Sequence, residues 1–310
     1  MKRLFFGFTI AALIAGGQTL RGQKGGNPFV DHSDTGETVH VLPAPAAIHS
    51  PHDTQPTDAP QQGSGVYSPS YGSGQLIYHT GGREIPWAGF FAIYWNSTVA
   101  NSKLTSTGST LQSTIYSFVT SFSGSPDYTV IQQYGNPDTI QPMIAWAGEL
   151  VDKQPTQATI SDSKVQSYIA SLFANGSVTP NTRTIYAVYF PSSMKIALQG
   201  GTSCSAFCGY HGHFTYNNND YKYAVFPYTD CRACSVSGKT VFDMLTVVGS
   251  HEIREAVTDP DLNAWFDSAG YEADDKCAWH NLYRMNGFLV QPEYSNGGGI
   301  YPGPGCVVPK

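Results

Sequence analysis

Charged side chains are scarce in this chain of 310 residues, and positively charged ones are the scarcer kind. The sequence has 17 Lys and Arg against 23 Asp and Glu, and charged residues make up 13% of it. Proteins that bind nucleic acid need clustered positive charge to neutralise phosphates. The balance therefore disfavours a nucleic-acid partner.

Long apolar runs are also missing, except at the N-terminus. There Lys2 and Arg3 precede an apolar run of roughly 14 residues that ends in small residues, which is the layout of a secretory signal peptide. We expect residues 1–22 to be removed on export, and the loss of Lys2, Arg3 and Arg21 would leave 14 basic residues against 23 acidic ones, a balance of −9. No later run approaches the roughly 20 apolar residues of a membrane span. The sequence thus predicts a secreted protein of the periplasm, cell wall or medium, with no integral membrane anchor.

Familiar motifs of covalent catalysis are absent as well. No GxSxG elbow occurs among the many serines, which argues against a serine hydrolase of that class. A cysteine nucleophile is disfavoured because the cysteines come in an even number in an exported chain, as disulfide-bonded cysteines do.

The six cysteines lie in three couples that are Cys204 and Cys208, Cys231 and Cys234, and Cys277 and Cys306. An oxidising compartment favours disulfides, although the sequence alone does not fix the pairing. We expect each couple to form its own bridge. The spacing of the first four cysteines also fits a structural zinc site, which export disfavours.

Residues 23–74 are poor in apolar runs and rich in proline, glycine and serine. Such a composition is typical of irregular chain. We therefore expect a mostly irregular leader over 23–74, with order beginning near "QLIYHTGG", and a single globular domain over 75–310.

Strand-like and helix-like segments alternate within that domain. Apolar runs rich in β-branched and aromatic residues predict strands, which stand at 87–97, 142–151, 182–191 and 221–228. Amphipathic periodicity with capping residues predicts helices, which stand at 109–123 and 161–176. The alternation predicts an α+β fold, a mixed sheet flanked by helices, with a C-terminal part stabilised by disulfides.

A further helix is expected around "VVGSHEIREAVTDP", residues 247–260. Thr240, followed three residues later by Asp243, is a good start, because the hydroxyl caps a backbone amide and the carboxylate complements the positive helix end. Pro260 disfavours helical geometry in the residue before it, so the helix should end close to Thr258.

This helix carries the clearest chemical pattern in the chain, His251-Glu252-x-x-Glu255. His251 and Glu255 lie one turn apart on the stripe that also carries apolar residues, so both should turn towards the interior. Zinc proteases use HExxH in this way, with the intervening glutamate activating water. The plainer alternative is a histidine and a glutamate that hydrogen-bond at a helix end.

Acidic residues are concentrated just downstream of this pattern, with eight of the 23 acids between residues 252 and 275. The repulsion between these negatively charged side chains is reduced most effectively by a bound cation. In "YEADDKC", Glu272 and Asp275 stand close to Cys277, so that one of the two acids would be a third ligand and the other its support. An imidazole with carboxylates suits zinc, manganese or iron, whereas an all-oxygen shell from the same acids would suit calcium.

Other histidines are weaker candidates. His211 and His213 alternate along an extended segment, "CGYHGHF", and so point the same way, which would place both at the mouth of a cleft or at a metal. Packing and hydrogen bonding are the favoured explanation for both, more so for His213, and His280 is less informative still.

Five ordered blocks resemble the Exordium family, also called phosphate-induced protein 1, of secreted, cell-wall-associated plant proteins linked to growth. The blocks are "CGYHGHF" (208–214), "YAVFPYTDCRAC" (223–234), "VVGSHEIREAVTDPDLNAWFD" (247–267), "YEADDKC" (271–277) and "FLVQPEYSN" (288–296). The resemblance implies secretion and a cell-wall setting, but no settled enzymatic activity. This chain keeps a His-Glu pair in the helix that many plant members lack.

Two hypotheses follow from these patterns. In the first, the protein is a zinc-dependent hydrolase with a zincin-like helix, acting on an extracellular peptide or related substrate. His251 and Glu255 bind the ion, Glu272 or Asp275 completes the shell, and Glu252 acts as general base. In the second, it is a non-catalytic extracellular protein associated with cell-wall polymer, and its ion, zinc or calcium, is structural.

Overall fold

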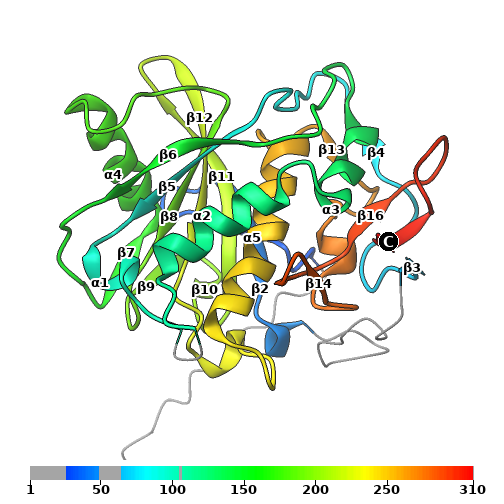
Figure 1. Ribbon diagram of the computed structural model, residues 1–310. Coiled ribbons are helices and arrows are strands. Elements are labelled where there is room, and N and C mark those ends of the chain that lie inside the picture. Colours follow the sequence, from blue (N-terminus) through cyan, green and yellow to red (C-terminus); the bar gives the residue numbers. More distant parts are fainter. Residues whose placement is uncertain (1–25, 49–63, 105–106, 310) are drawn as a thin grey trace, which may run out of the picture.

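The computed structural model describes residues 26–48, 64–104 and 107–309 (Figure 1). The predicted signal peptide, 1–22, lies outside the described residues. The described chain has the predicted α+β fold, with one large mixed sheet, three long helices and four small sheets.

The large sheet has seven strands, in the order β1 (Val30–His32), β2 (Thr38–Pro43), β11 (Phe207–Tyr216), β12 (Asn219–Phe226), β8 (Thr184–Tyr189), β5 (Gly89–Tyr94) and β6 (Ala145–Val151). The pairs from β1 to β12 are antiparallel, and those from β12 to β6 are parallel. β8 and β12 are almost wholly buried, which explains their continuous apolar runs. The four strands predicted from such runs are confirmed.

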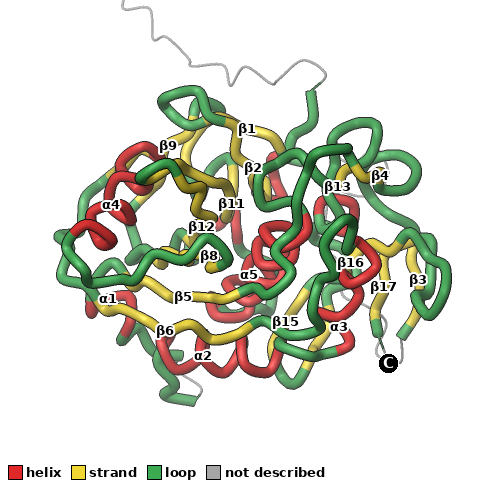
Figure 2. Tube along the Cα trace, turned by 90° about the horizontal axis from the view of Figure 1, so that it is seen from above, coloured by secondary structure: helices red, strands yellow, loops and turns green. Residues whose placement is uncertain are grey.

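Three long helices cover this sheet, α2 (Leu111–Phe122), α4 (Asp162–Ala174) and α5 (Val241–Thr258). The connections from β5 to β6 and from β6 back to β8 run in opposite directions, so right-handed crossovers put their helices on opposite faces. Accordingly, α2 and α5 lie together on one face and α4 lies on the other (Figures 1 and 2). Two short helices, α1 (Ser97–Ala100) and α3 (Pro126–Thr129), complete the α-helical part.

Short elements pack around this frame. The small sheets consist of β7 (Thr159–Ser161), β9 (Lys195–Leu198) and β10 (Gly201–Thr202); β4 (Ile77–Tyr78) and β13 (Trp265–Phe266); β14 (Tyr283–Met285) and β15 (Phe288–Val290); and β3 (Gly65–Tyr67), β16 (Glu293–Ser295) and β17 (Gly305–Val308). Four 3₁₀ turns are η1 (Pro45–Ala47), η2 (Val130–Tyr134), η3 (Arg232–Cys234) and η4 (Asp275–Cys277).

Helix α5 runs through the interior and positions the candidate site. Its start is the predicted one, because Thr240 and Asp243 form a reciprocal capping box, and it ends at Thr258. Nearly every residue of α5 is buried, since it packs on β11, β12, β2 and β15. Gly209 of β11 allows this close approach: a Cβ there would clash with Val248 of α5.

The predicted leader is wrong for residues 26–48. They form a hairpin of β1 and β2, and β2 pairs with β11 inside the large sheet. Its "VHVLP" stretch is almost wholly buried, with Val39, Val41 and Leu42 in the core. The proline- and serine-rich residues that follow dominated the composition and masked a short strand, which needs only about five suitable residues. Order therefore begins well before residue 75.

The predicted disulfide pairing is correct for Cys277–Cys306 and wrong for the other two bridges. The structure joins Cys204 to Cys231 and Cys208 to Cys234, each with Cα atoms 5.6 Å apart. Cys231 is the N-cap of η3 and Cys234 its last residue, whereas Cys204 precedes β11 and Cys208 lies in it, so the bridges join two separate segments rather than closing each on itself. The alternative zinc site is also wrong, because all four sulfurs are in disulfides.

None of the described helices combines the length and the apolar character that a membrane span requires.

Candidate metal centre

Two histidines from segments far apart in sequence face each other in the large sheet. His40 of β2 and His211 of β11 are direct cross-strand partners, and their ring centroids lie 5.9 Å apart. Partners on antiparallel strands point to the same face. Since Gly209, two residues before His211, lies against α5, both imidazoles point towards that helix.

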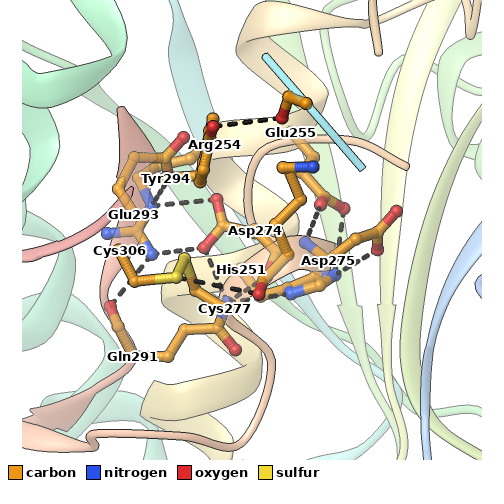
Figure 3. Close-up of a disulfide and its surroundings, with 12 residues drawn as sticks. His251, Arg254, Glu255, Asp274, Asp275, Cys277, Gln291, Glu293, Tyr294 and Cys306 are labelled. Atoms are coloured by element: carbon orange, nitrogen blue, oxygen red, sulfur yellow. Dashed lines mark hydrogen bonds and ion pairs between the residues drawn. A yellow bond between two sulfur atoms is a disulfide. The ribbon is translucent and has the colours of Figure 1, made fainter. Parts of the chain in front are cut away.

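Helix α5 and the segment around η4 supply the acidic side of the cluster. His251, Glu252 and Glu255 come from one turn of α5, and all are fully buried. Glu272 and Asp275 come from the η4 segment, where the Asp275 amide donates to Glu255 Oε1 at 3.0 Å. Figure 3 shows Asp275 near His251, with the Cys277–Cys306 disulfide to one side in the same close-up. The disulfide thus anchors the segment that carries both acids.

The distances between nitrogen and oxygen atoms are those of ligands around one point. His211 Nε2 lies 3.5 Å from Glu255 Oε2 and 3.5 Å from Glu272 Oε2. Ligands bonded at about 2.0–2.1 Å to a tetrahedral ion stand about 3.3–3.4 Å from each other. His40 Nδ1 adds a contact of 2.8 Å to Glu272 Oε1. One ligand atom from each of these four residues lies within 4.8 Å of all the others.

The same atoms lack hydrogen-bond partners. His40 Nδ1, His211 Nε2, His251 Nε2 and both oxygens of Glu272 are buried and make no hydrogen bond within the described structure. His251 Nε2 lies 2.9 Å from Glu255 Oε2, yet the angles are not those of a hydrogen bond. Unpaired buried polar atoms cost about 1–3 kcal/mol each, and more when charged. Their lone pairs converge, which is the arrangement that a bound cation would satisfy.

Negative charge at the centre is not balanced by nearby lysine or arginine in the described part of the chain. Arg254 of α5 points the other way and pairs with Asp127, Asp274 and Glu293, and Lys276 pairs with Asp267. At the centre, the buried acids without a lysine or arginine partner are Glu252, Glu255, Asp259, Glu272 and Asp275. A buried carboxylate must be paired, hydrogen-bonded, protonated or bound to metal.

Protons can supply part of this balance when no metal is present. Burial would lower the pKa of His251, but Glu255 overcomes it and raises that pKa to about 9. Burial would likewise lower the pKa of His211, but Glu272 and Glu255 overcome this effect and raise that pKa well above its ordinary value. Burial raises the pKa of Glu252 to about 8 and that of Asp259 to about 8. The metal-free centre therefore holds protons that a cation would displace.

A second layer of polar groups fixes the orientation of His251. Gln291 Nε2 lies 3.1 Å from His251 Nδ1 and donates to the Asp274 carbonyl at 2.9 Å. Asp274 in turn is held by the fully buried Arg254 (Figure 3). The contact with Gln291 restricts rotation of the imidazole ring. The ring therefore keeps Nε2 towards Glu255.

The centre is enclosed. His211, His251, Glu252, Glu255, Glu272 and Asp275 are 0% exposed, and His40 is 6% exposed. Phe29, just before β1, stacks against His251 with centroids 6.5 Å apart. The prediction that His211 lines a cleft is therefore wrong, because its side chain is fully buried on the face of the sheet that packs against α5.

The sequence-predicted residues His251, Glu252, Glu255, Glu272 and Asp275 do converge, but two members were not recognised. For His211 the sequence favours a packing role over a cleft or a metal, and it does not single out His40. The signal for His40 was its place in the alternating "TVHVLP". His213 lies further along β11 in a different group, with Asp220 and Asp261.

The group of His213, Asp220 and Asp261 is a weaker candidate for an ion site. His213 Nδ1 lies 3.1 Å from Asp220 Oδ2, and Lys222 pairs with Asp261. These side chains are partly exposed, and the lysine already supplies a positive charge.

Comparison of the chain with protein-family models, with curated proteins and with solved structures finds no match. The function must therefore be inferred from the chemistry of the centre.

Proposed function

We propose that this protein is a secreted metalloprotein whose divalent ion is bound by His40, His211, Glu255 and Glu272. The observation that carries the proposal is the position of His211 Nε2, which is fully buried, unpaired, and 3.5 Å from an oxygen of each glutamate. A hydrogen-bonded pair would be shorter, at about 2.7–2.9 Å. Ligands of a common ion have this spacing.

Zinc fits the donor atoms better than calcium. Two imidazoles and two carboxylates are a normal zinc set, and manganese or iron would accept the same donors. Calcium binds through oxygen, and the imidazoles would contribute nothing to it. We therefore place zinc first and calcium last.

A structural role suits the burial of the centre. The ion would join β2, β11, α5 and the η4 segment, which are brought together from positions 40, 211, 255 and 272 of the chain. Closed four-ligand sites are typical of structural zinc. Three of the five blocks that resemble the Exordium family carry His211, Glu255 and Glu272, whereas His40 lies outside the blocks. We propose on that basis that the chain is an Exordium-like extracellular protein with a stabilising ion, and that a cell-wall polymer is its partner.

A second candidate function, metal-dependent hydrolysis of a peptide or related substrate, rests on Glu252. With a single ion bound by the four residues above, Glu252 is a carboxylate left over, and both of its oxygens are buried without hydrogen bonds. Such a group has the chemistry of a general base. If a hydrolytic activity is found, Glu252→Gln should abolish it while metal stays bound. An unchanged rate would exclude this role.

Metal analysis tests the main proposal. The full exported chain, purified without chelator, should carry close to stoichiometric zinc, manganese or iron. The metal-free chain should gain thermal stability on adding that ion, by about 2.7 kcal/mol at a free concentration 100 times the dissociation constant. No bound metal together with no thermal shift for any of these ions or for calcium would end the proposal.

A further inference from the structure

The enclosed centre holds more ligand side chains than one ion of this kind uses. Three histidines and four carboxylates point into it, which are His40, His211, His251, Glu252, Glu255, Glu272 and Asp275. A zinc ion takes about four ligands. His251, Glu252 and Asp275 remain outside the four-residue group.

The remaining ligands form a group of their own. One atom each of His251, Glu252 and Glu255 lies within 4.8 Å of the other two. Asp275 Oδ1 stands 3.7 Å from His251 Nε2. Both oxygens of Glu252, together with His251 Nε2 and Asp275 Oδ1, are buried and unpaired. This group therefore shows the same unsatisfied donor atoms as the first.

Glu255 belongs to both groups and lies between them. Its Oε2 is 2.9 Å from His251 Nε2 and 3.5 Å from His211 Nε2. Its Oε1 accepts a hydrogen bond from the Asp275 amide, which fixes the carboxylate. A carboxylate held between two histidines in this way is placed to bridge two ions, which in two-metal sites stand about 3.5–4 Å apart.

Charge favours the same arrangement. The carboxylates of Glu252, Glu255, Glu272 and Asp275 carry four negative charges when ionised, and all four are fully buried. One divalent ion would leave two of these charges uncompensated in a medium where that is costly. Two divalent ions would balance all four.

We propose that the centre binds two divalent ions, one on His40, His211 and Glu272 and one on His251, Glu252 and Asp275, with Glu255 bridging them. The assignment rests on the proposed metal-binding function and extends it. Glu252 then serves as a ligand, whereas a general base would leave the metal content unchanged when replaced.

Stoichiometry decides the matter in the full chain. Metal-free protein titrated with Mn²⁺ should take up two ions per chain, and the bound pair should show the spin-coupled electron paramagnetic resonance spectrum of neighbouring ions. Uptake of one ion would overturn this inference and leave the proposed function standing. Uptake of none, with zinc as well, would overturn both. Two ions with uncoupled spectra would place them apart, which also contradicts a shared Glu255.

Variants locate each ion. Glu252→Gln and His40→Ala should each lower the uptake from two ions to one, because each removes a ligand of a different ion. His213→Ala is the matched control on β11 and should keep two. Two ions retained in Glu252→Gln would contradict the assignment. If a variant does not fold, the stoichiometry and the electron paramagnetic resonance spectrum of the wild type still test the two-ion proposal.

Discussion

At the scale of single residues, the account depends on His211, because it faces two carboxylates at once without a hydrogen bond to either. It is fully buried, so neither solvent nor salt screens its environment. A positive ion among these three groups would convert a destabilising arrangement into a stabilising one.

His211→Ala should therefore weaken zinc binding by more than about 100-fold, because even a residue that only supports a ligand contributes about 10–100-fold. His213→Ala changes the same residue type two positions along the same strand, where the side chain is partly exposed. It should leave the affinity unchanged. Competition with a chromophoric chelator measures both. Equal affinities for wild type and His211→Ala would remove this residue from the ligand set.

The pH dependence follows from the groups with raised pKa. His251 rises from 6.5 to about 9 and Glu252 from 4.5 to about 8, so both favour the folded state while protonated. Their contribution is complete below the unfolded pKa values and is lost as pH rises through the folded ones. The metal-free protein should become less stable between about pH 4.5 and about pH 9, while the stabilisation by zinc should grow over the same range. Thermal melts with and without zinc measure this, and a zinc effect independent of pH would contradict it.

At the scale of elements, the centre is held by parts of the chain that the Cys277–Cys306 bridge keeps together. η4 carries Asp275, and Glu272 lies just before it. The strand β17 at the other end of the bridge is paired with β16 and β3. A bridge that holds η4 in place therefore also holds Glu272 and Asp275 in place.

Replacing Cys277 and Cys306 together by serine should lower both stability and zinc affinity, with a stability loss of about 2–5 kcal/mol. The matched control replaces Cys204 and Cys231 by serine, which opens a loop of similar length that does not include η4. It should lower stability without lowering the affinity of the folded protein. Calorimetric titration at a temperature where both variants are folded separates the two effects. A similar affinity in both would show that the bridge does not position the acids.

How far the sequence predicts the fold and the centre depends on whether the signal is local. Helix α5 was predicted with its ends, because Thr240, Asp243 and Pro260 act within one turn. Glu272 and Asp275 could be predicted because they lie in an acidic segment close to Cys277. The contact of His40 with His211 spans 171 residues, and no local pattern encodes it. Crossed disulfides were missed for the same reason: which turns meet is decided by packing.

At the scale of the whole molecule, the hairpin of β1 and β2 makes the site an interior one. Because the hairpin extends the sheet beside β11, Phe29 packs on His251 and the site residues are buried, an ion could leave only when part of the fold opens. An exposed site would exchange its metal without such opening.

Release of zinc to excess chelator should therefore be slow, and it should accelerate with sub-denaturing concentrations of urea in proportion to local opening. Phe29→Ala, which uncovers His251, should speed release, whereas Tyr116→Ala, an exposed aromatic on α2, should not. Stopped-flow and manual-mixing traces with a chromophoric chelator cover the time range. Release at mixing speed from the wild type would contradict an enclosed centre.

The most direct test of the central claim is anomalous X-ray scattering from crystals of the full chain grown with zinc and measured at both sides of the zinc absorption edge. We predict an anomalous peak within bonding distance of His211 Nε2 and Glu255 Oε2. A map without a peak there, in crystals whose mother liquor holds saturating zinc, would show that protons alone satisfy these residues and would contradict the account.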